Sequence, residues 1–323
     1  MDNQKYSPIE KINTEKLFDL LLKSAETNLV ELSKVLKLDK KNIRLLISRL
    51  KDMGLDIYQK ADNIKLITKI ERVDTHLIKT EINKAKINKP VNYYFSITST
   101  NKLAKEDHKI AIYISEHQSA GKGRQAKLWI TPLAQSIAIS ITHDFKFGLN
   151  ELSGLNIAIG VAIINTVKKY GYTHLGLKWP YDILGQDGKV AGILIEASGN
   201  KNTSRVIIGI GINWQVRQSL LDSIEQDCMN ISIDNCSKTE FIASLIIAVE
   251  EILIEFAQNK LTNIASIWQQ FDALSKRTIN IITDNKIQQA KYIGINQHGL
   301  LRVEINQQIK TLASGEVSIR KID

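Results

Sequence analysis

The hydrophobic pattern of residues 14–67 predicts three short helices followed by two strands. Apolar residues recur at three- and four-residue intervals in residues 17–25 and again in 29–36, which is typical of a buried helix face. Asp39 is a good N-cap for a third helix that runs to about Asp52, and Gly54 is suited to end it. Residues 55–58 and 64–67 alternate like strands, so a hairpin should follow.

This order of helix, short turn, helix and hairpin is typical of a winged DNA-reading unit, in which the second helix of the pair enters the major groove. From Asp39 to Lys51, that helix carries five cations against one anion, Asp39, for a net charge of +4. The alternative is a solvated basic face in a lysine-rich protein. We predict DNA contacts from Lys40, Lys41, Arg44 and Ser48; the remaining cations are Arg49 and Lys51.

Strand-like and helix-like patterns alternate through residues 91–274. Ser99-Thr100-Asn101 is a helix-start signature directly after an expected strand, and its polar groups can also face a ligand. Apolar runs at 110–114 and 136–141 flank a polar loop, and the second run could lie at a sheet edge. The remaining expected elements are a buried helix over 151–169, strands over 175–179, 189–196 and 205–213, and helices over 239–259 and 263–274.

The ends of the chain complete the predicted fold class, which is α+β with several domains. From Arg277 onward, short alternating strands with turns at 284–285, 297–299 and 314–315 favour a small β-barrel. Residues 68–90 are charged and lack a strong apolar stripe, which favours a linker with one short helix. The expected units are a winged helix-turn-helix, a linker, a mixed α/β domain and a barrel, over residues 1–68, 69–90, 91–274 and 275–323 respectively.

The polar loop of residues 115–131 is the strongest candidate for chemistry. Gly121 and Gly123 allow backbone N–H groups to approach a ligand, and Lys122, Arg124 and Lys127 add three cations. Such a loop suits a phosphate or carboxylate, although an ordinary solvated turn is an equal alternative. The spelling also imitates a dinucleotide fingerprint. The following residues 127–135 contain a proline and are too few for the crossover helix which that motif needs.

A second candidate region is a pair of apolar strands that contain isolated charges. Lys178, Asp182 and Lys189 lie in strongly apolar surroundings, where burial is costly unless each is paired or holds a ligand. Gly192 lies mid-strand, which often marks close approach of a ligand or backbone, and Asn213 ends a further buried strand.

Composition narrows the class of protein without identifying it. The net charge of +9 and the pI near 9.3 favour an acidic partner such as nucleic acid. Two cysteines are too few for a disulfide scaffold. We expect a cytoplasmic protein with no membrane partner, because the N-terminus lacks a signal-peptide core and the longest apolar run is polar-interrupted and short.

Taken together and in this order, these motifs resemble the bifunctional biotin–protein ligases that also repress biotin genes. The resemblance covers nearly the whole chain, including an SH3-like barrel at its end. Its carriers are Ser99-Thr100-Asn101, Gln118 with Gly121-Lys-Gly-Arg124, Trp129, Lys178-Trp-Pro180 with Asp182, residues 189–196 and residues 209–213.

The resemblance implies that biotin and ATP, with Mg²⁺, form biotinyl-5'-AMP, and that biotin then passes to a lysine of a biotin carboxyl carrier domain of acetyl-CoA carboxylase. It implies catalytic roles for Lys189, Arg124 and Asp182, with Asp182 either a Mg²⁺ ligand or a base. Biotin would be bound by Ser99, Thr100, Asn101, Gln118, Lys122, Gly123, Arg124, Lys189 and Gly192. The nucleotide would be bound by Gly121, Lys127, Trp129, Asn213 and Arg320.

The resemblance also implies a biotin-responsive repressor that binds operator DNA as a ligand-promoted homodimer. Three positions depart from the family pattern: Lys122 replaces an arginine, Ala126 a glycine and Tyr181 an asparagine. Lysine keeps the charge but loses the planar fork that makes bidentate contacts. Two alternatives follow, a lipoate or octanoate transferase and a biotin-sensing repressor whose ligase activity is weak or lost. The Lys-Trp-Pro-x-Asp run and the DNA-reading unit argue against the transferase.

Overall fold

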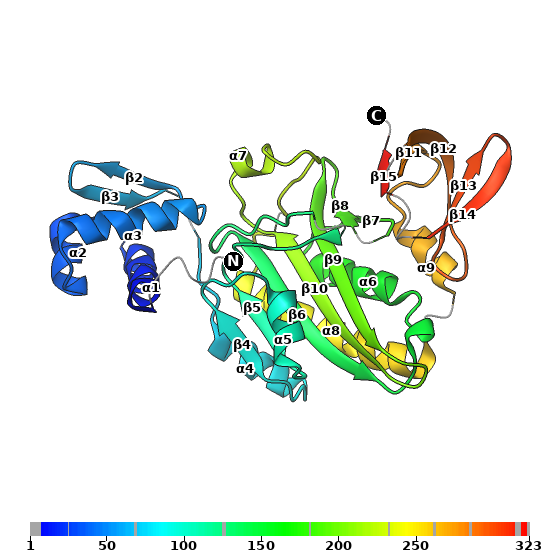
Figure 1. Cartoon of the computed structure of the whole chain (residues 1–323), viewed down its shortest axis with the longest axis horizontal. Helices are drawn as coiled ribbons and strands as arrows, with labels where there is room; N and C mark the ends of the chain where they lie inside the picture. The colour runs from blue at the N-terminus through cyan, green and yellow to red at the C-terminus, as the bar shows by residue number, and fades with distance from the viewer. Residues whose placement is uncertain are drawn as a thin grey trace.

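The computed structural model describes residues 8–24, 26–67, 70–124, 127–180, 182–231, 233–260, 263–283, 286–313 and 318–321. Three sheets follow one another along the long axis of the molecule, and the seven-stranded sheet lies in the middle (Figure 1). Among the described residues, no helix is long and apolar enough to cross a membrane.

The N-terminal unit packs three helices against a small sheet. Its helices are α1 (Pro8–Lys23), α2 (Leu29–Leu36) and α3 (Lys40–Asp52), and its strands β1 (Glu26–Asn28), β2 (Ile57–Lys60) and β3 (Asn63–Leu66) pair in the order β1-β3-β2. The Asn28 side chain caps α2 and that of Asp39 caps α3 by accepting from backbone N–H groups. The three helices and the hairpin therefore form as the sequence predicted, and β1 is an addition that the pattern did not indicate.

A buried apolar cluster holds this unit together. Leu17, Leu21, Ile43 and Leu50 are each fully buried in it, and full burial of one such side chain contributes about 1.5–3 kcal/mol. The cluster also takes in Leu133 and Ala134, which follow the polar loop of residues 115–131, called the cationic loop from here on. The central part of the chain thus completes the core of the N-terminal unit.

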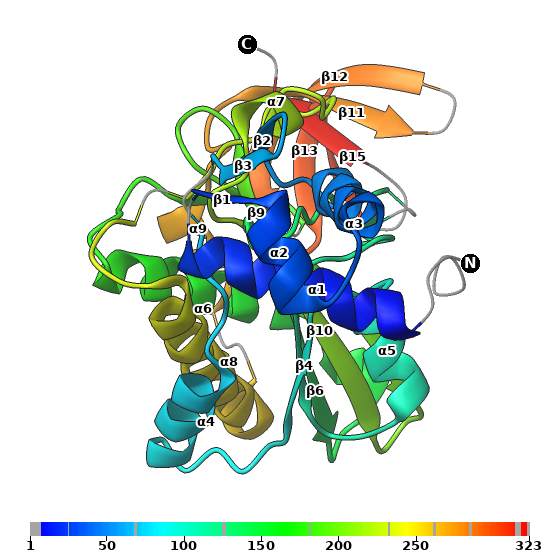
Figure 2. The same cartoon turned by 90° about the vertical axis from the view of Figure 1, so that its left-hand side faces the viewer.

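Seven strands form the central sheet in the order β4-β5-β6-β10-β9-β8-β7. Only the β4–β5 pairing is parallel. Helix α5 (Thr100–Asp107) lies on one face, and α4 (Thr75–Lys84), α6 (Leu155–Lys169) and α8 (Lys238–Asn259) lie on the other (Figures 1 and 2). The strands are β4 (Val91–Tyr94), β5 (Ile112–Ser115), β6 (Ser136–Phe145), β7 (Gly176–Lys178), β8 (Asp182–Leu184), β9 (Lys189–Gly199) and β10 (Ser204–Asn213).

The sheet order corrects one expectation about residues 136–141. They lie in β6, between β5 and β10, so they are interior to the sheet rather than at its edge. The outer strands are β4 and β7. The edge of β7 is covered, because Ala273 N donates to Leu177 O at 3.0 Å.

The segment 69–90, expected to be a linker with one short helix, contains that helix as α4, which packs against α8. Ile78 and Ile82 of this helix are buried in the main core of the central sheet. A buried ion pair lies near the start of the same segment. Lys238 Nζ is 3.0 Å from Glu116 Oε2, and Glu116 also accepts from Val73 N at 2.6 Å. These contacts fix the segment firmly to the central unit.

The C-terminal part consists of α9 (Ile264–Phe271) and a five-stranded antiparallel sheet in the order β14-β13-β12-β11-β15. Trp268 Nε1 of α9 donates to Tyr292 Oη of β12 at 2.9 Å. The expected turn at 297–299 is present, whereas those expected at 284–285 and 314–315 lie outside the described residues. The strands are β11 (Thr278–Thr283), β12 (Lys286–Ile295), β13 (Leu301–Ile305), β14 (Gln308–Leu312) and β15 (Ser318–Lys321).

Candidate active site

A cavity of about 1690 Å³ opens between the cationic loop and the face of the central sheet that carries α5. Its walls include the start of α5, residues 118, 122–124 and 127–130, parts of strands β6 to β10, and residues 224–228 and 270–274. All but one of the predicted biotin- and nucleotide-site residues whose side chains are described lie along it. The exception is Gly121, which packs inside the loop. Segments far apart in the sequence therefore meet at one site.

Backbone pairing gives the cationic loop a folded shape. Trp129 N donates to Gly121 O at 2.9 Å, and Gly123 N donates to Lys127 O at 2.7 Å. A Cβ atom on Gly121 would lie 2.4 Å from Trp129 O, so glycine is required there for close packing. Neither Gly121 nor Gly123 has positive φ, so the backbone conformation at these positions does not itself require glycine. Two of the family departures, Ala126 and Tyr181, lie outside the described residues.

One end of the cavity is built from a buried polar network. Gln118 Oε1 accepts from Thr100 N at 2.8 Å, and Gln118 Nε2 donates to Thr131 Oγ1 at 3.0 Å. Asn101 Oδ1 accepts from Ser140 Oγ at 2.6 Å. Thr100, Asn101 and Gln118 are each at most 9% exposed. The Ser99 side chain accepts from Lys102 N, which makes it the N-cap of α5, as its position in the sequence indicated.

The network leaves defined hydrogen-bonding capacity for a ligand. One of the two Gln118 Nε2 hydrogens is used by Thr131, so the other can donate. The Asn101 amide oxygen keeps one lone pair, so it can accept. A compact group that has both a carbonyl oxygen and an N–H matches this pattern, as an amide or a urea does.

The floor of the cavity depends on two glycines of the central strands. Trp129 lies flat against β9 and β10, where Cβ atoms on Gly192 and Gly211 would meet its ring at 3.1 and 2.4 Å respectively. Because a side chain at either position would displace the ring, both positions need glycine for Trp129 to pack here. The close approach predicted at Gly192 is therefore made by Trp129 and by the Lys189 side chain.

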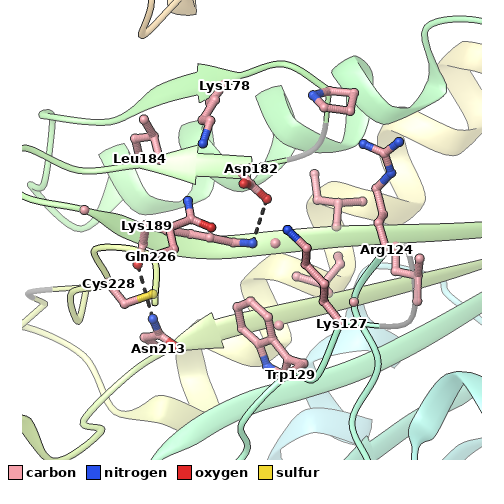
Figure 3. Close-up of a pocket in the computed structure, with 18 of the residues that line it drawn as sticks. Arg124, Lys127, Trp129, Lys178, Asp182, Leu184, Lys189, Asn213, Gln226 and Cys228 are labelled. Carbon is pink, nitrogen blue, oxygen red and sulfur yellow. Dashed lines mark hydrogen bonds and ion pairs between the residues drawn. The ribbon is translucent and has the colours of Figure 1, made fainter. Parts of the chain in front are cut away.

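Charged groups line the other end of the cavity. Lys189 Nζ is 2.7 Å from Asp182 Oδ1, and both side chains are largely buried. The same ammonium group lies 5.2 Å from the centre of the Trp129 ring. Figure 3 shows the charged side chains above Trp129, with Lys178, Asp182 and Lys189 on the left and Lys127 and Arg124 on the right. This end of the cavity suits an anionic ligand, with cations on both sides of it.

Of the predicted nucleotide-site residues Asn213 and Arg320, only Asn213 has a side chain in the described part of the structure. Asn213 Nδ2 donates to Lys189 O and to Met229 O, each at 3.2 Å, so its amide hydrogens serve the protein backbone. The Arg320 side chain lies outside the described part, although its backbone belongs to β15. Burial raises the pKa of Cys228, a wall residue that the sequence did not single out.

Asp182 does not form part of a ready-made metal site. Among the described residues, no cluster of three His, Cys, Asp or Glu side chains could hold a metal ion. Asp182 is already paired with Lys189. Mg²⁺ is commonly bound by one or two carboxylates together with substrate phosphates. Its binding here would therefore depend mainly on the nucleotide.

The predicted DNA-contact residues Lys40, Lys41, Arg44 and Ser48 are all exposed on α3. Arg49 is different, because it is 8% exposed and pairs with Glu10 at 2.6 Å, so its charge does not belong to that face. Lys40 and Arg44 both contact Asp62, at 2.6 and 3.0 Å. This contact, mainly with Lys40, lowers the pKa of the Asp62 carboxyl.

Comparison with known proteins agrees with this geometry. Residues 93–213 match the model of the Biotin/lipoate A/B protein ligase family. "Bifunctional ligase/repressor BirA" of Escherichia coli is 29% identical over 65% of this chain and 66% of its own length. The protein of the same name from Salmonella typhimurium is 26% identical over 86% of this chain and 88% of its own length.

The fold also matches a solved structure. The biotin protein ligase from Aquifex aeolicus in complex with biotin and ATP superposes with a TM-score of 0.63 at 21% identity, over 72% of this chain and all of that one. At this identity the likeness shows the fold alone. Residues 93–213 are therefore similar to the Biotin/lipoate A/B protein ligase family, and the fold is that of a biotin protein ligase.

Proposed function

We propose that the chain is an ATP-dependent biotin–protein ligase that also represses transcription in response to biotin. The observation that carries the ligase proposal is the polar network of Thr100, Asn101 and Gln118. It offers one acceptor and one donor at the closed end of the cavity, as the ureido ring of biotin requires. The cationic end of the same cavity suits a nucleotide and the biotin carboxylate.

In the first step, a carboxylate oxygen of biotin attacks the α-phosphorus of ATP, and pyrophosphate leaves. Both reactants are anions, so the site must supply positive charge and alignment. Lys189 would fill this role, and the burial of its side chain beside the floor of the cavity supports the proposal. One charged hydrogen bond contributes roughly 1.5–3 kcal/mol. Arg124 and Lys127 of the loop would hold phosphate oxygens, and Mg²⁺ bound to ATP would neutralise further charge.

In the second step, a lysine amine of the acceptor attacks the carbonyl carbon of biotinyl-5'-AMP. The C–N bond forms, AMP leaves with the electron pair of the C–O bond, and the nitrogen loses a proton. Asp182 is the carboxylate nearest to Lys189 in the cavity and would accept that proton. The acceptor we propose is the biotin carboxyl carrier domain of acetyl-CoA carboxylase, in line with the names of two relatives, each "Biotin--[acetyl-CoA-carboxylase] ligase".

The repressor proposal rests on the N-terminal unit, which we interpret as a winged helix-turn-helix over residues 1–68. Helix α3 presents Lys41, Arg44 and Ser48 to solvent, and β2 and β3 form the hairpin beside it. We further propose that residues 91–274 are the catalytic unit, that 69–90 link it to the N-terminal unit, and that 275–323 form an SH3-like barrel. A single module of this size needs a partner for specific binding, so operator binding would require a ligand-promoted homodimer.

Contacts between the N-terminal unit and the catalytic unit support coupling of the two activities. Gln135 is fully buried, and its Nε2 donates to Gly54 O at 2.8 Å. Its Oε1 accepts from Arg217 N at 3.1 Å. This one amide therefore joins the segment that follows the cationic loop, the turn after α3 and the segment that leads to residues 224–228.

The ligase proposal is tested by incubating the protein with biotin, Mg-ATP and a carrier domain, and then measuring the mass of the carrier. One biotinyl group should be added, and a carrier in which the acceptor lysine is arginine should remain unmodified. An unmodified wild-type carrier would overturn the proposal and leave a biotin-sensing repressor as the alternative. Repression is tested by sedimentation and DNA footprinting with no ligand, with biotin, and with biotin and ATP. Equal protection in all three would contradict ligand control.

A further inference from the structure

Asn101 lies across three paired strands of the central sheet. Gly209 of β10 pairs with Ser140 of β6 on one side and with Leu194 of β9 on the other. A Cβ atom on Gly209 would be 2.3 Å from Asn101 Oδ1, so the amide rests directly on this glycine. Glu196 is two residues beyond Leu194 on β9, and its carboxylate reaches the amide from there.

The partners of Asn101 allow a single orientation of its amide. Asn101 Nδ2 is 3.0 Å from Glu196 Oε2 and 3.4 Å from Leu194 O. A carboxylate and a backbone carbonyl only accept hydrogen bonds, so the NH₂ group must face them. The oxygen is thereby turned toward Ser140 Oγ, 2.6 Å away, and Ser140 must donate to it. Both amide hydrogens are used, which leaves the ligand an acceptor and no donor.

We propose that Glu196 is a positioning residue that sets the substrate specificity of the site by holding the Asn101 amide in this orientation. The inference rests on the proposed function and deepens it, because it predicts that the ligand must present an N–H to Asn101 Oδ1. Glu196 and Ser140 do not line the cavity, whereas Asn101, Leu194 and Gly209 do. Glu196 therefore acts on the ligand through Asn101.

The substitution Glu196→Gln tests this role with little change in shape. A neutral amide makes a weaker bond to Asn101 Nδ2, and it can instead donate to Oδ1 after the Asn101 amide has turned over. We expect KM for biotin to rise about tenfold, with KM for ATP unchanged and kcat at saturating biotin within about twofold. The matched control is Lys105→Met, which removes the 3.6 Å contact between Lys105 and Glu196 Oε1 but leaves the Asn101 contact in place. It should keep the wild-type KM for biotin.

A second measurement separates positioning from a general loss of structure. Biotin methylated on one ureido nitrogen lacks one N–H, and each of the two N-methyl isomers is offered as a substrate for adenylation. Wild type should adenylate one isomer far more slowly than biotin. In Glu196→Gln, the ratio of kcat/KM for biotin to kcat/KM for that isomer should be about tenfold smaller than in wild type. Thermal unfolding of each variant checks the fold. If Glu196→Gln does not fold, Glu196→Asp is used instead. Its shorter carboxylate should change the same ratio in the same direction, but by less than the tenfold expected for Glu196→Gln.

Two outcomes would overturn the proposal without touching the ligase activity. If wild type is active, and the Glu196 variant has the same KM for biotin and the same ratio between biotin and the isomer, then Glu196 does not position Asn101. A rise in KM in both Glu196→Gln and Lys105→Met would assign the effect to the surface ion pair. A wild-type enzyme that forms no adenylate at all would instead refute the proposed function.

Discussion

Two glycines on one strand should separate recognition of biotin from recognition of the nucleotide. Gly209 and Gly211 lie two residues apart on β10, so both face the cavity. A Cβ atom would meet Asn101 Oδ1 at 2.3 Å in Gly209→Ala and Trp129 at 2.4 Å in Gly211→Ala. Ordinary contacts lie between about 3.4 and 4 Å. Each alanine must therefore move its neighbour by roughly 1 Å, and such a misplacement in an active site can cost about 100-fold in rate.

The two variants are matched controls, because substitution, strand and size of the clash are the same. We expect Gly209→Ala to raise KM for biotin by about 100-fold while KM for ATP changes little. Gly211→Ala should instead raise KM for ATP, because Trp129 is predicted to pack against the nucleotide. Steady-state pyrophosphate release with each substrate varied in turn measures both constants, and thermal unfolding should show similar losses, about 1–3 kcal/mol each. Equal changes in the same constant for both variants would refute this division of the cavity.

Three further outcomes follow from single contacts. Burial lowers the pKa of His117 to about 4 from its ordinary value of 6.5. The folded state therefore holds His117 neutral. Its contribution to the free energy of unfolding is complete above pH 6.5 and falls by up to about 3 kcal/mol as the pH drops toward 4, so the free energy of unfolding of His117→Gln should depend less on pH than that of wild type. The same pH dependence in both proteins would contradict this. Asp62→Asn releases Lys40 and Arg44, so non-specific DNA binding should strengthen, and the slope of log K against log salt concentration should become more negative by about one to two. The control Glu26→Gln removes an exposed acid beside the same hairpin and should change neither the affinity nor the slope. Gln135→Leu breaks the contact with Gly54 O, so ligand should no longer change DNA affinity while adenylation continues, and a normal ligand response would exclude this route of coupling.

Local patterns in the sequence were sufficient for most of the fold. Helix starts at Asp39 and Ser99 could be predicted because a capping side chain acts on its own neighbours. The sheet order could not be predicted, because it depends on contacts between strands that are distant in the chain. The interior position of β6 is such a case, because a continuous run of apolar residues has the same sequence pattern in an interior strand as in a buried edge strand.

The site divides in a similar way. Ser99, Thr100, Asn101 and Gln118 were predicted as a group, and the structure brings the last three into one network. Ser140 and Glu196 were missed as parts of it, although a lone hydroxyl in the buried run 137–141 was a usable signal. The role of Gly211 was also missed, because it depends on Trp129 arriving from a loop about 80 residues away, and no local pattern reports that approach.

The central claim is that this cavity joins biotin to AMP with the help of Lys189. The most direct measurement is biotin-dependent exchange of labelled pyrophosphate into ATP, without any carrier protein or DNA. The account predicts exchange by the wild-type chain that requires biotin and falls by at least about 100-fold in Lys189→Met, while thermal unfolding shows the variant folded. Exchange that is absent in wild type, or that proceeds at the same rate without Lys189, would contradict it.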